Sequence, residues 1–174
     1  RAILAGKVIG NSVLAFSQIL LIAGVVLLGG AITGSQLLLD GLGMPIVWFV
    51  VLFTVGFVML ASLYAAAAAL VSRAEDLGTA TSPLMMLVML PYIAVIIFNN
   101  NPVALQIMSY VPFSAPVAVP MRVYLQSQEW WEPYLSLAIL VAFTVAVIAF
   151  AAKIYERSLL KTGSIVKWRD ALKQ

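Results

Sequence analysis

The chain has 174 residues, of which 63% are hydrophobic and 10% are charged, and its mean hydropathy is +1.06. A soluble domain has roughly 25% charged residues, so this composition excludes an ordinary water-soluble enzyme, a nucleic-acid-binding module and a disordered linker. The chain contains neither cysteine nor histidine, which removes thiol chemistry, disulfides and the commonest general base and metal ligand. The sequence therefore predicts a membrane protein, with no cofactor and no nucleic-acid partner.

Four apolar segments are long enough, or nearly long enough, to cross a bilayer as helices. A hydrocarbon core of ~30 Å requires about 20 apolar residues in helical form. The segments lie at about 8–32, 45–71, 82–98 and 134–152. They predict an all-α fold, in which residues 1–174 form a single transmembrane domain built as a polytopic bundle of four spans.

Prolines and capping residues indicate where two of these spans begin. Pro45 is well placed for the first turn of the second span, where a proline removes no helical hydrogen bond. Thr81 and Ser82 followed by Pro83 predict the start of the third span, as a capping residue and a first-turn proline. Pro91 lies in the middle of that short span, so we expect a kink there.

The segment between the third and fourth spans suits neither a loop nor a span. Residues 103–125 are too apolar for a hydrated loop and, with Pro112, Pro116 and Pro120, too rich in proline for one spanning helix. Non-helical backbone at membrane depth must be buried in protein or line a watery cavity. We predict an extracellular re-entrant hairpin of two short helices. A hairpin lying flat on the membrane surface is the alternative.

Nine of the ten basic residues fall on one predicted side of the membrane. Arg1 and Lys7 precede the first span, Arg73 follows the second, and six more lie in the tail 153–174, whereas Arg122 alone lies on the opposite side. Positive residues favour the cytoplasmic side, so we expect a multi-pass protein of the cell membrane with both ends of this segment in the cytoplasm. The basic tail would also attract anionic membrane lipids.

Three polar residues, Lys7, Asn11 and Gln18, share one face of the first predicted helix because of their spacing of four and seven residues. A polar stripe on a membrane helix should face the bundle interior or a water-filled path. The stripe predicts hydrogen bonds between helices of the bundle, which we favour. Contact with a transported substrate is the alternative.

Arg122 is the only basic residue on the predicted outer side. It ends the re-entrant segment, where it could pair with Glu129 or, together with Pro112, Pro116 and Pro120, line an outer gate. An arginine that snorkels to the membrane interface is the simpler interpretation. The residues alone leave both interpretations open.

The predicted cytoplasmic loop between the second and third spans carries both signs of charge, with Arg73, Glu75 and Asp76. A solvated turn has this composition, and so does a docking loop for a cytosolic partner. Because the loop joins two spans directly, a partner that pushed on it would move both helices. We therefore predict that these three residues form a coupling loop.

The motifs of several enzyme classes are missing from the sequence. A serine nucleophile has no histidine base. A phosphate-binding P-loop requires G-x-x-x-x-G-K-[ST], and Gly6-Lys7 is followed by Val8 instead. We expect a protein that is not an enzyme and that has no ATPase motif of its own.

Four segments carry a resemblance to a known family. They are LAGKVIG at 4–10, SRAED at 72–76 with TSP at 81–83, YVPFSAP to PMR at 110–122, and YERSLL at 155–160. In their order and composition they resemble the ABC-2 type permeases, and within these the sodium-extrusion (NatB-like) branch. The resemblance covers nearly the whole chain, and the third segment is the most specific of the four.

The resemblance implies a permease subunit of an ABC exporter, which moves substrate outward when a separate cytosolic ATP-binding cassette ATPase is active. Family members have six spans and work as two permease subunits or halves. The chain, which starts at Arg1, would then be the C-terminal four-span portion of a longer polypeptide, and Glu75 would lie near the ATPase. A non-transporting membrane scaffold is the alternative function. A self-gating channel is less favoured, because the sequence has no filter-like motif or ring of charges.

Overall fold

The computed structural model describes residues 2–34, 36–71 and 74–163. Within these residues every regular element is helical. The elements are α1 (Ala2–Ile32), α2 (Gln36–Ala69), the 3₁₀ turn η1 (Ala74–Asp76), α3 (Leu77–Ile97), α4 (Pro102–Tyr110), α5 (Ala115–Tyr124) and α6 (Glu132–Gly163). The helices long and apolar enough to cross a membrane cover Ala5–Ile32, Gly41–Ala69, Leu77–Ile97 and Glu132–Ile154. The predicted all-α bundle with four spans is confirmed.

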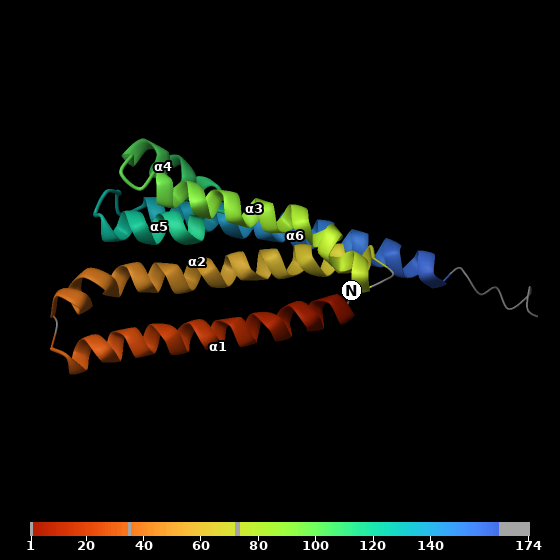
Figure 1. The fold of residues 1–174 in the computed structure, drawn as a ribbon, viewed down its shortest axis with the longest axis horizontal. Helices are drawn as coiled ribbons and strands as arrows, with labels where there is room; N and C mark the ends of the chain where they lie inside the picture. Colours follow the sequence, from red (N-terminus) through yellow and green to blue (C-terminus); the bar gives the residue numbers. More distant parts are fainter. Residues whose placement is uncertain (1, 35, 72–73, 164–174) are drawn as a thin grey trace, which may run out of the picture.

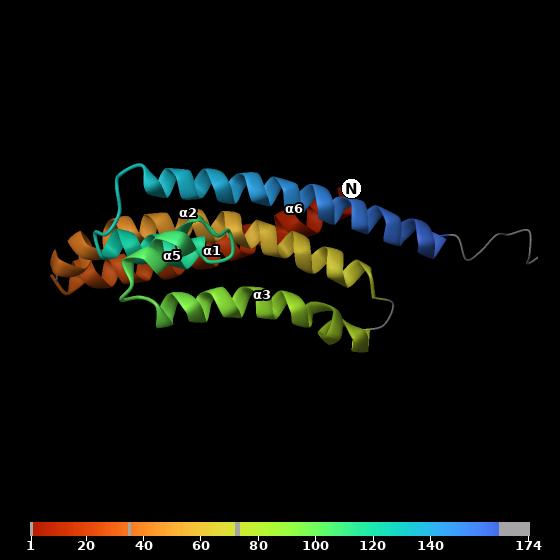
Figure 2. The ribbon, with the colours of Figure 1, turned by 90° about the horizontal axis from the view of Figure 1, so that it is seen from above.

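The long helices lie side by side in an elongated bundle with α2 at its centre (Figure 1). Helix α2 packs against α1, α5 and α6, and makes fewer contacts with α3. Figure 2 shows α6 and α3 on opposite sides of α2, with the short helices between them. Both short helices lie at the end of the bundle where α2 and α6 begin, which we call the hairpin end.

The second span begins earlier than the sequence predicted. Helix α2 starts at Gln36, so Pro45 lies inside it and not in its first turn. A proline inside a helix removes one backbone hydrogen bond, and membrane helices tolerate this when neighbouring helices and local adjustments satisfy the freed carbonyl. The expectation for Pro45 was therefore wrong, because the preceding apolar residues continue the helix through the proline.

The third span also begins earlier than predicted. Helix α3 starts at Leu77, directly after η1, and both Pro83 and Pro91 lie inside it. The Thr81 hydroxyl donates to the carbonyl oxygen of Leu77 at 2.8 Å. Thr81 therefore bonds back within a helix that has already begun and does not cap its start. The kink expected at Pro91 stays a prediction.

The last helix is longer than the span that it contains. Helix α6 continues to Gly163, beyond the predicted end of the span at 152. Its last turns include lysine, arginine, glutamate and leucine, which are strong helix formers, so the helix continues past the apolar segment. The remainder of the predicted tail, 164–174, lies outside the described residues.

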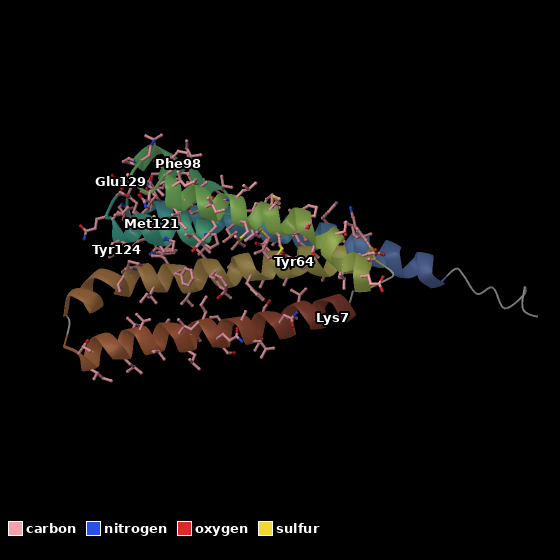
Figure 3. All side chains as sticks on the ribbon, viewed as in Figure 1. Lys7, Tyr64, Phe98, Met121, Tyr124 and Glu129 are labelled. Carbon is pink, nitrogen blue, oxygen red and sulfur yellow. The ribbon has the colours of Figure 1, made fainter. Side chains whose placement is uncertain are left out.

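The buried core lies where α2, α5 and α6 meet. Its largest cluster of buried side chains comprises Leu52, Met59, Ala115, Val119, Leu140 and Val147. Trp48 of α2 and Tyr134 of α6 pack edge to face near the hairpin end, with ring centroids 4.9 Å apart. Most side chains of α1 and α3 are exposed instead (Figure 3). Within this chain, the tightly packed part of the bundle is therefore the part that contacts the short helices.

Candidate functional site

Two short helices in sequence, α4 and α5, form a hairpin between the third and fourth long helices. The Asn101 side chain accepts hydrogen bonds from the backbone N–H groups of Val103 and Ala104, at 3.1 and 3.2 Å, and so caps α4. Pro102 occupies the first turn, where the missing N–H costs nothing. These local interactions define the beginning of the first short helix.

The turn between the short helices contains Pro112 and ends at Ser114. The buried Ser114 hydroxyl donates to the carbonyl oxygen of Met108 at 2.5 Å, which ties the two helices together. Pro116 lies in the first turn of α5, and Pro120 lies inside that helix. The predicted pair of short helices is present, with two of the three prolines at positions that end or begin a helix.

The tip of the hairpin lies level with the middle of the spans. A Cβ atom built on Gly56 of α2 would lie 3.0 Å from Cγ of Pro116, so the absence of a side chain at Gly56 lets α5 approach. The Phe113 ring packs edge to face on Phe143 of α6, with centroids 5.7 Å apart. Both Gly56 and Phe143 lie near the centres of their apolar segments. At its other end, α5 brings Tyr124 beside Gly41, near the start of α2.

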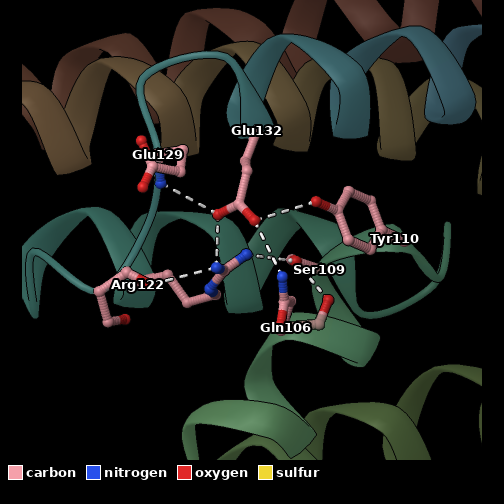
Figure 4. A network of polar contacts seen from close by, with 7 residues as sticks. Gln106, Ser109, Tyr110, Arg122, Glu129 and Glu132 are labelled. Atoms are coloured by element: carbon pink, nitrogen blue, oxygen red, sulfur yellow. Dashed lines mark hydrogen bonds and ion pairs between the residues drawn. The ribbon is translucent and has the colours of Figure 1, made fainter.

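Arg122, in the last turn of α5, is the centre of a buried polar network (Figure 4). Its side chain is only 4% exposed. Nη1 donates to the Ser109 hydroxyl at 2.9 Å, and Nη2 donates to the backbone oxygen of Ser127 at 3.1 Å. Nη2 also lies 2.5 Å from Oε2 of Glu132. Arg122 therefore links α5 to α4, to the following loop and to α6.

Glu132 starts α6 and accepts hydrogen bonds at both carboxylate oxygens. Oε1 accepts from Nε2 of Gln106 at 3.0 Å and from the Tyr110 hydroxyl at 3.2 Å. Oε2 accepts from Arg122 and from the backbone N–H of Glu129 at 3.2 Å. A buried carboxylate with this many donors is stabilised in its charged form. Glu132, and not Glu129 as one interpretation of the sequence had it, is the acid that pairs with Arg122.

Tyr110 completes the network from the end of α4. Burial and the nearby Glu132 carboxylate raise the pKa of its phenol above the usual 10.0. The phenol therefore remains protonated at neutral pH and can donate its hydrogen bond to Glu132.

A polar recess of about 380 Å³ opens beside this network at the hairpin end. Its lining residues are Pro102, Val103, Gln106, Arg122, Gln126, Ser127, Gln128, Glu129 and Glu132. Among the described residues, Nε of Arg122 is buried without a hydrogen-bond partner. No group of side chains in the described ranges could hold a metal ion. The recess offers hydrogen-bond donors and acceptors, among them the carboxylates of Glu129 and Glu132.

The other residues predicted to form sites lie away from this network. Glu75 and Asp76 are exposed in η1, at the opposite end of the bundle, and Arg73 lies outside the described residues. Lys7, Asn11 and Gln18 are all exposed on α1. Among the described residues this polar face does not meet another helix, because α1 turns a neighbouring face, which carries Val8 and Ile19, toward α2. Its contact with another helix or with a water-filled path stays a prediction.

Sequence reasoning missed the partners of Arg122, which are Glu132, Gln106, Ser109 and Tyr110. One signal was available, since Glu132 lies on the same predicted side of the membrane as Arg122 and directly precedes the fourth predicted span. The other three partners, Gln106, Ser109 and Tyr110, lie on α4, and they reach Arg122 and Glu132 only because the hairpin folds α4 back against α5 and α6. No sequence spacing identifies them.

Comparison with known proteins agrees with a bundle of long apolar helices. Residues 1–153 match the sequence model of one protein family, whose members are described as ABC-2 family transporter proteins. The chain is therefore a multi-pass membrane protein, and it belongs to the ABC-2 transporter family.

Two curated relatives are similar to this chain over much of its length. One is the uncharacterized protein YhaP of Bacillus subtilis (strain 168), 25% identical over 146 residues, which cover 83% of this chain and 35% of the relative. The other is the uncharacterized protein MJ1024 of Methanocaldococcus jannaschii, 28% identical over 116 residues, which cover 66% of this chain and 29% of the relative. The chain thus spans about a third of the length of these relatives. No solved structure matches it.

Proposed function

We propose that this chain is the membrane-spanning part of a permease subunit of an ABC exporter in the sodium-extrusion (NatB-like) branch. A separate cytosolic ATP-binding cassette ATPase would drive it, and a second permease subunit or half would complete the pathway. Membership of the ABC-2 family supports a transporter that works with such an ATPase. The four segments described in the sequence support the branch.

The observation that carries this proposal is the family match over residues 1–153. A more detailed part of the proposal concerns the hairpin, which the buried Arg122–Glu132 pair holds against α6. The hairpin tip packs against the central parts of α2 and α6 through Pro116 and Phe113. This packing supports a re-entrant hairpin that reaches the middle of the membrane and returns. A hairpin at this depth would close the outer half of a transport path, with Pro112, Pro116, Pro120 and Arg122 forming the gate.

The orientation of the permease in the cell membrane is also part of the proposal. The basic residues favour cytoplasmic placement of both ends of this segment. The hairpin end would then face outward. The exposed carboxylates of Glu75 and Asp76, at the opposite end of the bundle, would meet the ATPase in the cytoplasm, together with Arg73.

The experiment uses inside-out membrane vesicles that contain the complete permease and its ATPase. We expect ATP-dependent accumulation of sodium ions in the vesicles, and loss of accumulation when the P-loop lysine of the ATPase is replaced. ATP hydrolysis without sodium accumulation would refute the sodium-extrusion branch. A permease that associates with no ATP-binding cassette ATPase would refute the exporter and favour a membrane scaffold.

A further inference from the structure

The polar recess beside Arg122 lies at the depth where the last span begins. Glu132, which lines the recess, is the first residue of the apolar segment Glu132–Ile154. Trp130 and Trp131 directly precede it, and both side chains are exposed. Tryptophan is enriched at the boundary between hydrocarbon and water. The recess therefore lies at the depth of the lipid headgroups.

The side chains that line the recess carry one more negative than positive charge, because they include two carboxylates and one guanidinium. Arg122 and Glu132 neutralise each other in their ion pair. The Glu129 side chain is exposed, and no described side chain pairs with its carboxylate. A positively charged group that entered the recess would therefore find a free partner in Glu129.

The same recess also offers donors to a negatively charged group. Gln126 and Gln128 line it together with Arg122, and each amide carries two N–H donors. Nε of Arg122 has no acceptor among the described residues, so the guanidinium retains capacity for a further hydrogen bond. Guanidinium groups are typical donors to phosphate oxygens. The recess thus combines partners for both charges of a zwitterion.

An apolar strip continues from the recess along α4. Val103, which lines the recess, and Ile107, one helical turn further on, are 65% and 62% exposed. From there α4 leads to the tip of the hairpin, where Phe113 packs level with the middle of the spans. A phospholipid presents its polar and apolar parts in this order with increasing depth. A free polar molecule would use the recess and gain nothing from the strip.

We propose that the recess binds the headgroup of a phospholipid with a primary ammonium group, of the phosphatidylethanolamine type. The ammonium donates hydrogen bonds to the Glu129 carboxylate, and the phosphate accepts from the amides and from Arg122. One acyl chain lies along Val103 and Ile107. The volume of about 380 Å³ is at the lower end of the ~300–1,000 Å³ of ligand pockets, which suits a headgroup and not a whole lipid. The inference rests on the proposed re-entrant hairpin, which places the strip in hydrocarbon.

The first test follows the thermal unfolding temperature of the complete polypeptide in detergent while defined lipids are added. We expect the largest rise with phosphatidylethanolamine. Phosphatidylcholine has no ammonium N–H to donate, and phosphatidylglycerol has no ammonium and a net negative charge, so both should stabilise less. Equal effects of the three lipids would overturn the proposal. An equal effect of soluble phosphoethanolamine would also overturn it, because the ligand would then be a free zwitterion and not a lipid.

A pair of matched variants tests the charge at Glu129. Glu129→Gln should weaken the response to phosphatidylethanolamine roughly two- to fivefold, as expected for the loss of one exposed charge pair. Glu156→Gln makes the same change in charge on α6, beyond the other end of its membrane-spanning segment, and should leave the response unchanged. An unchanged response in Glu129→Gln, or an equal loss in both variants, would overturn the proposal.

A photo-reactive, diazirine-bearing amino acid in place of Val103 identifies what lies beside the recess in membranes. After illumination we expect the peptide that contains position 103 to gain the mass of one phospholipid. A link to a segment outside these 174 residues, or no lipid adduct, would overturn the proposal, and in the first case the polypeptide itself would fill the recess. These measurements need neither ATP nor sodium, so lipid binding can fail while ATP-driven transport is retained, and transport can fail while lipid binding is retained.

Discussion

Arg122 of α5 and Glu132 of α6 form an ion pair in which Nη2 and Oε2 are 2.5 Å apart and each side chain is 4% exposed. Burial removes both charges from water, and this cost offsets much of the attraction between them. Gln106 and Tyr110 donate hydrogen bonds to Glu132, and the Ser109 hydroxyl accepts one from Arg122, so that much of the remaining capacity of the two groups is satisfied. The pair thus specifies where the hairpin meets the last long helix, more than it adds to net stability.

Removing one member of the pair should destabilise the protein strongly. Glu132→Ala leaves the Arg122 guanidinium buried without a counter-charge, which typically costs about 3–5 kcal/mol. We expect a clear fall in the thermal unfolding temperature of the purified protein in detergent, followed by circular dichroism. Glu129→Gln is the control, because the Glu129 side chain is exposed and only its backbone contributes to the network.

The double variant Arg122→Met with Glu132→Leu separates the charge pair from simple packing. Replacing both charges with apolar residues leaves no unpaired charge, so the double variant should be more stable than Glu132→Ala alone. If the double variant were less stable than Glu132→Ala, the two side chains would be contributing independently. The interpretation of the network as a coupled pair would then be wrong.

Gly56 should be the glycine of α2 least tolerant of a side chain. A Cβ atom there would lie 3.0 Å from Pro116 Cγ, and overpacking of this kind typically costs about 1–3 kcal/mol. We expect Gly56→Ala to lower the thermal unfolding temperature. Gly24→Ala in α1 is the matched control, since nothing lies within 4 Å of its Cβ position and alanine is the better helix former. Equal effects of the two substitutions would contradict the close approach of α5 to α2.

Composition predicted the number and approximate position of the long helices, because membrane-length apolar segments leave few alternatives. The starts of the second and third spans were wrong for a shared reason. Pro45 and Pro83 were interpreted by the rules for helix starts in water, whereas both lie inside membrane helices. A proline inside a helix leaves one backbone carbonyl without its helical hydrogen bond. The local sequence does not reveal whether neighbouring elements provide another donor for that carbonyl.

The candidate site was predicted only in part. Arg122 could be predicted because it is the lone basic residue on its side of the membrane, and the two short helices could be predicted from regularly spaced prolines in an apolar segment. The choice between Glu129 and Glu132 depends on how the loop after α5 returns to α6, which no spacing rule determines. Likewise, the direction of the polar face on α1 depends on which side α2 occupies.

The topology can be tested with single cysteines, because the chain contains none. Asn100→Cys lies at the hairpin end, just after α3, and Gln174→Cys lies in the tail. In intact cells an impermeant thiol reagent should label the first and not the second, since the basic residues favour a cytoplasmic tail. Permeabilised cells provide the control, in which both positions should react. The reverse labelling pattern would contradict the proposed orientation.

Charge reversal at η1 should uncouple transport from ATP hydrolysis. Glu75 and Asp76 are exposed between α2 and α3, so a partner that binds there can push on two spans at once. Glu75→Lys with Asp76→Lys would remove complementarity to a basic surface of the ATPase, and loss of a close charge pair at an interface typically costs about 2–5 kcal/mol. We expect the double variant to insert normally, while transport per ATP hydrolysed falls.

The matched control for this variant is Glu156→Lys with Asp170→Lys, which makes the same change in net charge after the last span. Glu156 lies on α6 alone, beyond its membrane-spanning segment, whereas η1 connects two spans directly, so a push near Glu156 would act directly on one helix. This control should therefore retain coupling, measured as transport and ATP hydrolysis in the same vesicles. Wild-type transport in the Glu75 and Asp76 variant, at normal expression, would mean that η1 is a solvated turn. Loss of coupling in both variants would instead point to a general effect of charge on the cytoplasmic side.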